Sequence, residues 1–148
     1  MGTDHDADVR ALLDERDIIR TMHRYCRALD DGLEDEWFDV FTADAVYDTF
    51  LPNGDAYVHL ATRDEFRAFL HAYPRRPVTA PKHVMVDPIV ELDGDDARVE
   101  SAFLFLNQAP DGTPPQVIAW GRYRDRFRRV DGRWRIAQRR CDTEAMLG

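Results

Sequence analysis

The hydrophobic pattern of the chain changes near residue 82, and this change constrains the fold more than any other feature. Before it, apolar residues recur at three- and four-residue spacings over residues 8–29, which is typical of an amphipathic helix. After it, apolar residues alternate with a period of two, which is typical of strands. We therefore expect an α+β fold, with helices in the first half covering one face of a curved antiparallel sheet.

Two shorter helices are expected between the first helix and the strands. Gly32 can supply the left-handed end of the first helix, and residues 34–41 begin with acids and continue into an aromatic pattern. Residues 45–51 are expected to form a strand, and Pro52, Asn53, Gly54 and Asp55 are expected to form a turn. Thr62 is a favourable N-cap for a third helix over residues 63–73.

The two-residue periodicity in the second half of the chain predicts an antiparallel meander of four strands. They are expected at residues 83–92, 98–108, 116–130 and 133–140. Asp93-Gly94 and Asp131-Gly132 are hairpin-turn dipeptides, and a longer Pro- and Gly-rich connection joins the two middle strands. A curved sheet of this kind creates a cavity under its helices.

Both faces of the strand at residues 98–108 are largely apolar. One face carries Ser101, Phe103, Phe105 and Asn107, and the other carries Ala102, Leu104 and Leu106. One of these faces must pack on the helices or line a pocket, and the other must also be covered. We expect a homo-oligomer, either a dimer or a trimer.

Size and charge narrow the class of protein. A chain of 148 residues with 44% hydrophobic residues forms one domain, residues 1–148, with a single core. A net charge of −8 argues against binding to nucleic acid or to an anionic membrane surface. No segment predicts a transmembrane helix or a secretory signal, so we expect a cytoplasmic protein.

Cofactor and metal motifs are absent from the sequence. The two cysteines, Cys26 and Cys141, form no CxxC pair, and the five histidines show no metal-ligand spacing. GxGxxG, P-loop and GxSxG patterns are also missing. We therefore expect no cofactor and no metal.

Four segments carry distinctive motifs: RYCRALDDG at residues 24–32, Trp37 and Phe41 with TADA, KHVMVDP, and GRYRDRFRRVDGRWRI near the end. Together they resemble the SnoaL-like family. The family belongs to the nuclear transport factor 2-like superfamily, so the resemblance implies a cone-shaped α+β barrel that encloses a pocket. That superfamily includes dehydratases, isomerases, small subunits of ring-hydroxylating dioxygenases and non-catalytic adaptors, so the fold alone does not fix the chemistry.

The resemblance implies a catalytic pair and a supporting phenol. Asp30 and His83 match the aspartate and histidine of the members that eliminate water or chloride, and Tyr25 matches a site tyrosine of the bile acid dehydratase. The chain departs from scytalone dehydratase at the positions that align near Asn107, Gly121 and Tyr123. The acid side of that enzyme's chemistry is therefore not implied here.

Each of these residues also has an ordinary structural interpretation. A carboxylate at the C-terminal end of a helix is electrostatically unfavourable, so Asp30 needs a compensating partner, unless it and Asp31 simply lie in a solvated loop. His83 is either a hydrogen-bonded strand residue or a base whose tautomer an aspartate fixes. Tyr25 is either a half-buried aromatic or a donor to a substrate oxygen.

A second group of residues is expected to bind the substrate. On the strands it consists of Tyr47, Thr49, Phe103, Phe105, Asn107, Tyr123 and Arg139. The aromatic members fit an ordinary core equally well, and Asn107 fits a strand end beside a turn. Arg139 and Arg140 lie on opposite faces of the last strand, so at most one of them points into the cavity.

The sequence therefore predicts a cofactor-independent lyase of the dehydratase type, or an isomerase. Its substrate would be a small apolar molecule that resembles a polyketide, a steroid or an aromatic compound. His83 would remove a proton, Asp30 would orient it and Tyr25 would polarise an oxygen. The alternative is a non-catalytic small-molecule-binding domain, or one like the dioxygenase small subunits.

Overall fold

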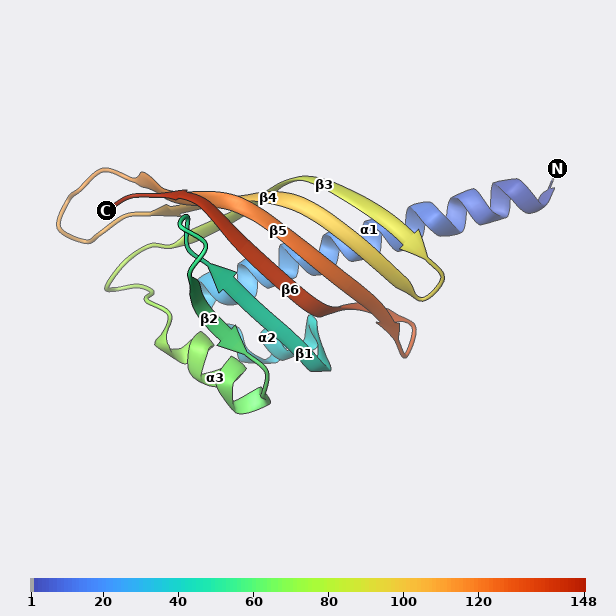
Figure 1. Cartoon of the computed structure of the whole chain (residues 1–148), viewed down its shortest axis with the longest axis horizontal. Helices are drawn as coiled ribbons and strands as arrows, with labels where there is room; N and C mark the ends of the chain where they lie inside the picture. The colour runs from blue at the N-terminus through green and yellow to red at the C-terminus, as the bar shows by residue number, and fades with distance from the viewer. Residues whose placement is uncertain (1) are drawn as a thin grey trace.

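The helices lie in the first half of the chain, together with two strands, and the second half supplies the other four strands of one curved sheet, as the change in periodicity predicts (Figure 1). The computed structural model describes residues 2–148. The helices are α1 (Gly2–Asp31), α2 (Glu34–Asp39) and α3 (Arg63–Ala72). The strands are β1 (Phe41–Phe50), β2 (Ala56–Leu60), β3 (Lys82–Asp93), β4 (Asp96–Asn107), β5 (Gln116–Val130) and β6 (Arg133–Met146).

The helix α1 starts earlier than expected, and its first half extends beyond the sheet (Figure 1). Its second half packs against β3 and β6 and buries one stripe of side chains at helical spacing. That stripe contains Ile18, Met22, Tyr25 and Leu29, all nearly inaccessible to solvent. Gly32 follows with a φ of 71°, so it supplies the left-handed end that the sequence predicts.

The two shorter helices differ in how well their ends match the expectation. α3 begins at a complete capping box between Thr62 and Glu65, as predicted. α2 ends at Asp39, two residues before the predicted end, because Phe41 already belongs to β1. The predicted helix therefore ran too far at its C-terminal end.

The sheet has the order β2-β1-β6-β5-β4-β3. Its last four strands form the predicted antiparallel meander, and the turns at Gly94 and Gly132 have positive φ. Two features differ from the expectation. Residues 56–60 form the edge strand β2, which the sequence did not predict, and β1 pairs with β6 in parallel, so the sheet is mixed rather than wholly antiparallel.

The sheet curves around the helices without closing (Figure 1). Gly121 lies in β5 where the register with β6 shifts, and its missing side chain allows the two backbones to approach closely. A Cβ atom at this position would lie 2.0 Å from the carbonyl oxygen of Asp142. The concave face carries the core and faces the helices, so the α+β class and the cone-like curvature expected from the sequence are both confirmed.

Among residues 2–148, no helix combines the length and the apolar character that crossing a bilayer requires.

Candidate active site

A cavity of about 600 Å³ lies between the concave face of the sheet and the segment formed by β2 and α3. Its wall is mainly apolar and rich in aromatic rings, including those of Phe69, Phe103 and Phe105. The described residues that line it include no Lys, Arg, Asp or Glu. The environment therefore suits an uncharged ligand and strengthens any hydrogen bond made inside it.

Asp30 contacts His83, which lines this cavity, while Asp30 itself is not among the lining residues. Nδ1 of His83 lies 2.6 Å from Oδ1 of Asp30, and the backbone N–H of His83 donates to both carboxylate oxygens at 3.1 and 3.0 Å. Nζ of Lys82 lies 3.8 Å from Oδ2. The side chains of Asp30 and His83 are only 3% and 8% exposed, so the pair is buried and Asp30 has the compensating partners that its position at a helix end requires.

This geometry assigns the tautomer of the imidazole. An ionised carboxylate only accepts hydrogen bonds, so Nδ1 of neutral His83 carries the proton and Nε2 carries the lone pair. The ring stacks on Phe105 with 4.7 Å between the centroids, which fixes its plane. A histidine held in this way can accept a proton at Nε2 while Asp30 stabilises the imidazolium that forms.

Tyr73 is a site residue that the sequence analysis missed. Its hydroxyl lies 3.2 Å from Nε2 of His83, and it lines the same cavity. It is the residue at the C-terminal end of α3, where its aromatic ring looks like the last apolar position of an amphipathic helix. The sequence indicates only that Tyr73 lies at the end of a helix, and this position does not show that its side chain contacts His83 in β3.

Tyr25 is fully buried and does not line the cavity. Its hydroxyl donates to that of Tyr47 at 3.1 Å, and Tyr47 does face the cavity. Burial raises the pKa of Tyr25 well above its ordinary value. Burial also raises the pKa of Tyr47, to about 12, although hydrogen bonds from Thr49 and Tyr25 act against it. The structure thus places Tyr47 between Tyr25 and any ligand.

Arg139 also lies away from the cavity wall. Its fully buried guanidinium makes two hydrogen bonds to Asp125, at 2.8 and 2.7 Å. It lies between the rings of Tyr25 and Tyr123, at 4.0 and 3.9 Å from their centroids. Arg139 therefore points inward and Arg140 outward, as alternation allows, but a carboxylate on the neighbouring strand pairs with Arg139 instead of a ligand.

The other residues predicted to bind substrate all line the cavity: Tyr47, Thr49, Phe103, Phe105, Asn107 and Tyr123. The amide oxygen of Asn107 already accepts hydrogen bonds from the hydroxyl of Thr79 and from the backbone N–H of Gln108. Cys141 lines the cavity as well, and burial raises the pKa of its thiol to about 12, so it stays neutral there. Within the part of the chain that the structure describes, no three His, Cys, Asp or Glu side chains are grouped to hold a metal ion.

Solved structures share this architecture. An NTF2-like protein with a cystatin-like fold from Novosphingobium aromaticivorans superposes with a TM-score of 0.81 at 19% identity, covering 95% of this chain and 88% of that chain. A provisionally named scytalone dehydratase from the same organism gives 0.76 at 22% identity, covering 93% and 88%. The beta subunit of a provisionally named aromatic-ring-hydroxylating dioxygenase, also from that organism, gives 0.79 at 18% identity, covering 94% of each chain. At these identities the likeness shows the fold alone.

No curated protein matches the chain. The family model of the SnoaL-like domain does match it, over residues 10–140. This match spans α1 to most of β6 and includes both Asp30 and His83. The chain therefore belongs to the SnoaL-like domain family and has the NTF2-like α+β fold.

Proposed function

We propose that this protein is a cofactor-independent lyase of the dehydratase type, or an isomerase, acting on a small uncharged ring compound. The observation that supports the proposal best is the buried pair of Asp30 and His83, whose Nε2 side faces an apolar cavity. His83 removes a proton next to a carbonyl group, and Asp30 holds the ring and balances its new charge.

Tyr47 is the group that we propose polarises the substrate oxygen. It faces the cavity, and its own oxygen accepts the hydrogen bond from Tyr25, so its proton is free to point toward a ligand. Tyr25 thus supports the site from behind instead of touching the substrate. A donor held in an apolar cavity stabilises a developing enolate more than it would in water.

The cavity supports an aromatic, polyketide-like or steroid-like substrate. A volume of about 600 Å³ admits a molecule of several fused or linked rings, and the aromatic wall offers faces for stacking. The described wall contains no Lys, Arg, Asp or Glu that would pair with a charged ligand. The name of the solved scytalone dehydratase neighbour is consistent with such a substrate.

Replacing His83 with Ala tests the proposal, and the chain offers a matched control. His59 also places Nδ1 2.6 Å from a carboxylate, that of Asp48, but its side chain is 63% exposed and does not line the cavity. A panel of neutral aryl β-hydroxyketones, polyketide-like phenols and steroid enones is screened for turnover. We expect His83→Ala to lower kcat by about 10²–10⁴-fold and His59→Ala to leave it unchanged. Equal activity of both variants would contradict the proposal.

The second candidate is a non-catalytic domain, like the dioxygenase beta subunit that shares the fold. It predicts that the cavity binds panel compounds without converting them, and that His83→Ala binds them as the parent protein does. Isothermal titration calorimetry alongside product analysis separates the candidates. Binding of a compound that is recovered unchanged favours the second candidate, whereas conversion that depends on His83 favours the first.

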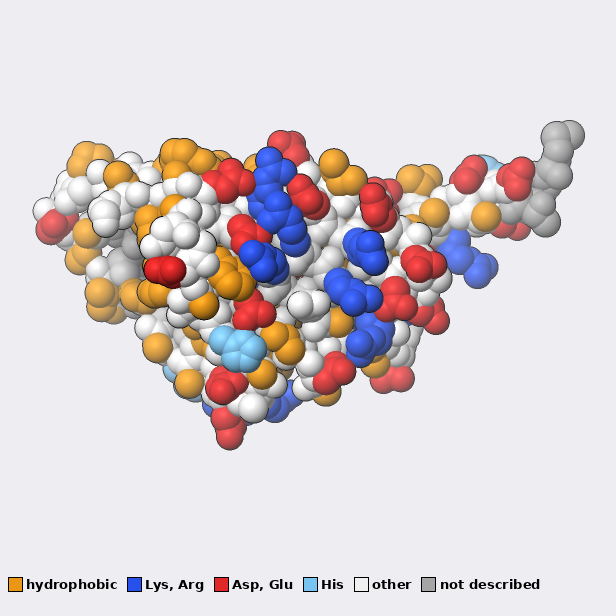
Figure 2. Space-filling view, in the orientation of Figure 1, with side chains coloured by type: hydrophobic (Ala, Val, Ile, Leu, Met, Phe, Trp, Pro, Cys, Tyr) orange, Lys and Arg blue, Asp and Glu red, His pale blue; other side chains and the backbone are white. Residues whose placement is uncertain are grey.

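The exposed apolar side chains on the convex face of the sheet are the evidence for a proposed homo-oligomer, either a dimer or a trimer. Figure 2 shows this face, with charges of both signs over the middle of the sheet and hydrophobic side chains gathered toward the end that holds the C-terminus. Trp120 on this face is 48% exposed, and its cross-strand neighbour Leu104 is half-buried. Sedimentation analysis of the protein and of Trp120→Glu is expected to show dissociation in the variant.

A further inference from the structure

We propose that Tyr73 is a second proton-transferring residue of the site and that Arg75 is the residue that positions it. This inference rests on the proposed function, because it assigns a role to the group that faces the base. The inference goes beyond the proposed function because it assigns roles to Tyr73 and Arg75, which do not belong to the pair formed by Asp30 and His83.

The hydroxyl of Tyr73 lies at the atom of His83 that must take the substrate proton. Because Nδ1 is bonded to Asp30, Nε2 carries the lone pair, so the Tyr73 hydroxyl, 3.2 Å away, is the donor. The Tyr73 ring is held by Phe69, with 5.7 Å between centroids, and by an edge contact with Phe105 at 6.2 Å. The hydroxyl therefore has one position within reach of both Nε2 and a ligand in the cavity.

This arrangement supports a balanced elimination. When substrate binds, the hydroxyl of Tyr73 turns from Nε2 to the departing oxygen, which frees the lone pair of Nε2. The substrate C–H bond then breaks, its proton goes to Nε2, and the electron pair forms the new double bond as the C–O bond breaks. The departing oxygen takes the hydroxyl proton of Tyr73 and leaves as water. The Tyr73 oxygen takes a proton back from Nε2, which restores both residues without any oxidant or reductant. Burial raises the pKa of the Tyr73 phenol, so its role is to donate in concert with that return and not to persist as a phenolate.

Arg75 connects the two helix ends that carry Asp30 and Tyr73. Its Nε and Nη2 donate to the carbonyl oxygen of Leu29, at 3.1 and 3.0 Å, beside Asp30 in α1. Its Nη2 also donates to the carbonyl oxygen of Leu70 at 2.7 Å, and its Nη1 donates to the backbone carbonyl oxygen of Tyr73 at 3.2 Å, at the end of α3. One guanidinium thus satisfies the terminal carbonyls of both helices and sets the distance between them across His83.

Gly32 leaves the room that Arg75 needs. A Cβ atom at this position would lie 2.9 Å from Nε and 3.0 Å from Cζ of Arg75. Arg75 is half-buried, whereas the adjacent Arg76 is exposed and makes none of these bonds in the described structure. This pair of neighbours provides a matched control for the positioning role.

The contact is tested first without any substrate. In protein labelled with ¹⁵N histidine, a donor on Nε2 shifts its resonance upfield, so Tyr73→Phe is expected to move the Nε2 signal of His83 downfield. Tyr57→Phe, which removes another hydroxyl from the cavity wall, is expected to leave it unchanged. An unchanged Nε2 signal in Tyr73→Phe would overturn the inference. This readout does not depend on turnover, so it can succeed or fail independently of the proposed function.

The relay is tested with two leaving groups. The probes are the β-hydroxyketone that dehydrates to benzalacetone and its β-chloro analogue, which needs no proton on the departing group. We expect Tyr73→Phe to lower kcat for the hydroxyl probe by about 10²-fold, to affect the chloro probe much less, and to leave KM nearly unchanged. Equal losses for both probes, or a parent protein that eliminates neither faster than buffer, would contradict the relay.

The positioning role is tested with Arg75→Met against Arg76→Met. Arg75→Met is expected to shift the Nε2 signal in the same direction as Tyr73→Phe and to lower turnover of the hydroxyl probe roughly tenfold, whereas Arg76→Met changes neither. Both are measured well below the melting temperature of each variant, so that partial unfolding does not contribute. A parent-like Nε2 signal in Arg75→Met would reject the role of Arg75 while leaving that of Tyr73 in place.

Discussion

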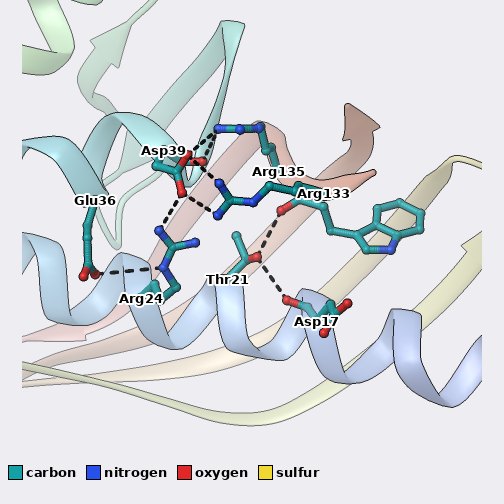
Figure 3. A network of polar contacts seen from close by, with 8 residues as sticks. Asp17, Thr21, Arg24, Glu36, Asp39, Arg133 and Arg135 are labelled. Atoms are coloured by element: carbon teal, nitrogen blue, oxygen red, sulfur yellow. Dashed lines mark hydrogen bonds and ion pairs between the residues drawn. The ribbon is translucent and has the colours of Figure 1, made fainter. Parts of the chain in front are cut away.

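Asp30 and Asp39 are two acidic residues close in sequence with opposite surroundings. Asp39 lies among three arginines, with Arg24 and Arg133 each within 2.6 Å and Arg135 at 2.9 Å (Figure 3). Partial burial raises the pKa of Asp39, but the hydrogen bonds of Arg24 and Arg133 outweigh it and lower that pKa to about 2. Asp30 instead is buried against the imidazole and the backbone N–H of His83, with Nζ of Lys82 farther away at 3.8 Å.

The difference lies in what the partner can do. An arginine stays protonated at every physiological pH, so the cluster around Asp39 is a fixed set of charges that joins α1, the end of α2 and β6. A histidine can gain and lose a proton, and its second nitrogen faces the cavity beside Asp30. The first carboxylate therefore contributes to stability, and the second can contribute to chemistry.

The largest expected effect separates the two carboxylates by activity. Asp30→Asn places an amide N–H against Nδ1 of His83, which favours the tautomer with the proton on Nε2 and so blocks proton abstraction. On a substrate found in the panel, we expect kcat to fall by about 10²–10⁴-fold, whereas Asp39→Asn keeps the activity of its folded fraction. Steady-state kinetics below both melting temperatures check this, and a fully active Asp30→Asn would remove the distinction.

The next effect separates them by stability. Asp39→Ala leaves Arg24, Arg133 and Arg135 close together without their shared carboxylate. We expect the free energy of unfolding to fall by about 2 kcal/mol, measured by urea denaturation. Asp44→Ala is a suitable control, because the carboxylate of Asp44 is exposed and pairs with one arginine, Arg128, so its loss should change little.

Acid provides a smaller test of the same cluster. The pKa of Asp39 is lowered in the folded protein to about 2, so its contribution is complete above the ordinary carboxyl range, about pH 4, and is lost as the pH falls toward 2. After allowance for partial solvent screening, this amounts to about 1 kcal/mol. Urea titrations at several pH values should show a shallower loss between pH 4 and 2 in Asp39→Ala. Parallel curves for the two proteins would contradict the assignment.

The smallest expected effect concerns the support behind the site. Tyr25→Phe removes the hydroxyl that donates to Tyr47 while keeping the buried ring. One neutral hydrogen bond contributes about 1 kcal/mol, so we expect kcat to fall about fivefold, with KM unchanged. Tyr47→Phe should cost more, because it removes the group that faces the ligand. A Tyr25→Phe defect larger than that of Tyr47→Phe would place Tyr25 at the substrate after all.

The structural elements that the sequence predicts correctly are those with local patterns. The capping box at Thr62, the Asp-Gly turns and the two-residue periodicity of β3 to β6 are each contained within a few neighbouring residues. β2 was missed because it is a short edge strand with mostly exposed side chains, and its pairing with β1 follows a turn without a strong apolar run. The parallel pairing of β1 with β6 joins residues far apart in the chain, so no local pattern reports it.

The site also contains residues that the sequence could identify and others that it could not. Asp30 and His83 follow from the resemblance to the SnoaL-like family, and the structure brings them into contact. Tyr73 could not be found in this manner, because its neighbour in β3 follows ten positions later through an irregular loop. The inward position of Arg139 follows from alternation along β6, but its pairing with Asp125 does not, since that carboxylate looks like one more charge among the arginines of β5.

The position of β6 in the sheet also governs when the fold can form during synthesis. β6 follows every other strand in the chain, yet it lies between β1 and β5 and hydrogen-bonds to both. During synthesis, β3, β4 and β5 can therefore pair as hairpins before β6 is available. Until then β1 and β2 lack the strand that joins them to the rest of the sheet. The part of the cavity wall that β1 and β2 provide, including Tyr47, Thr49 and Val58, joins the rest of the sheet only after β6 has been synthesised.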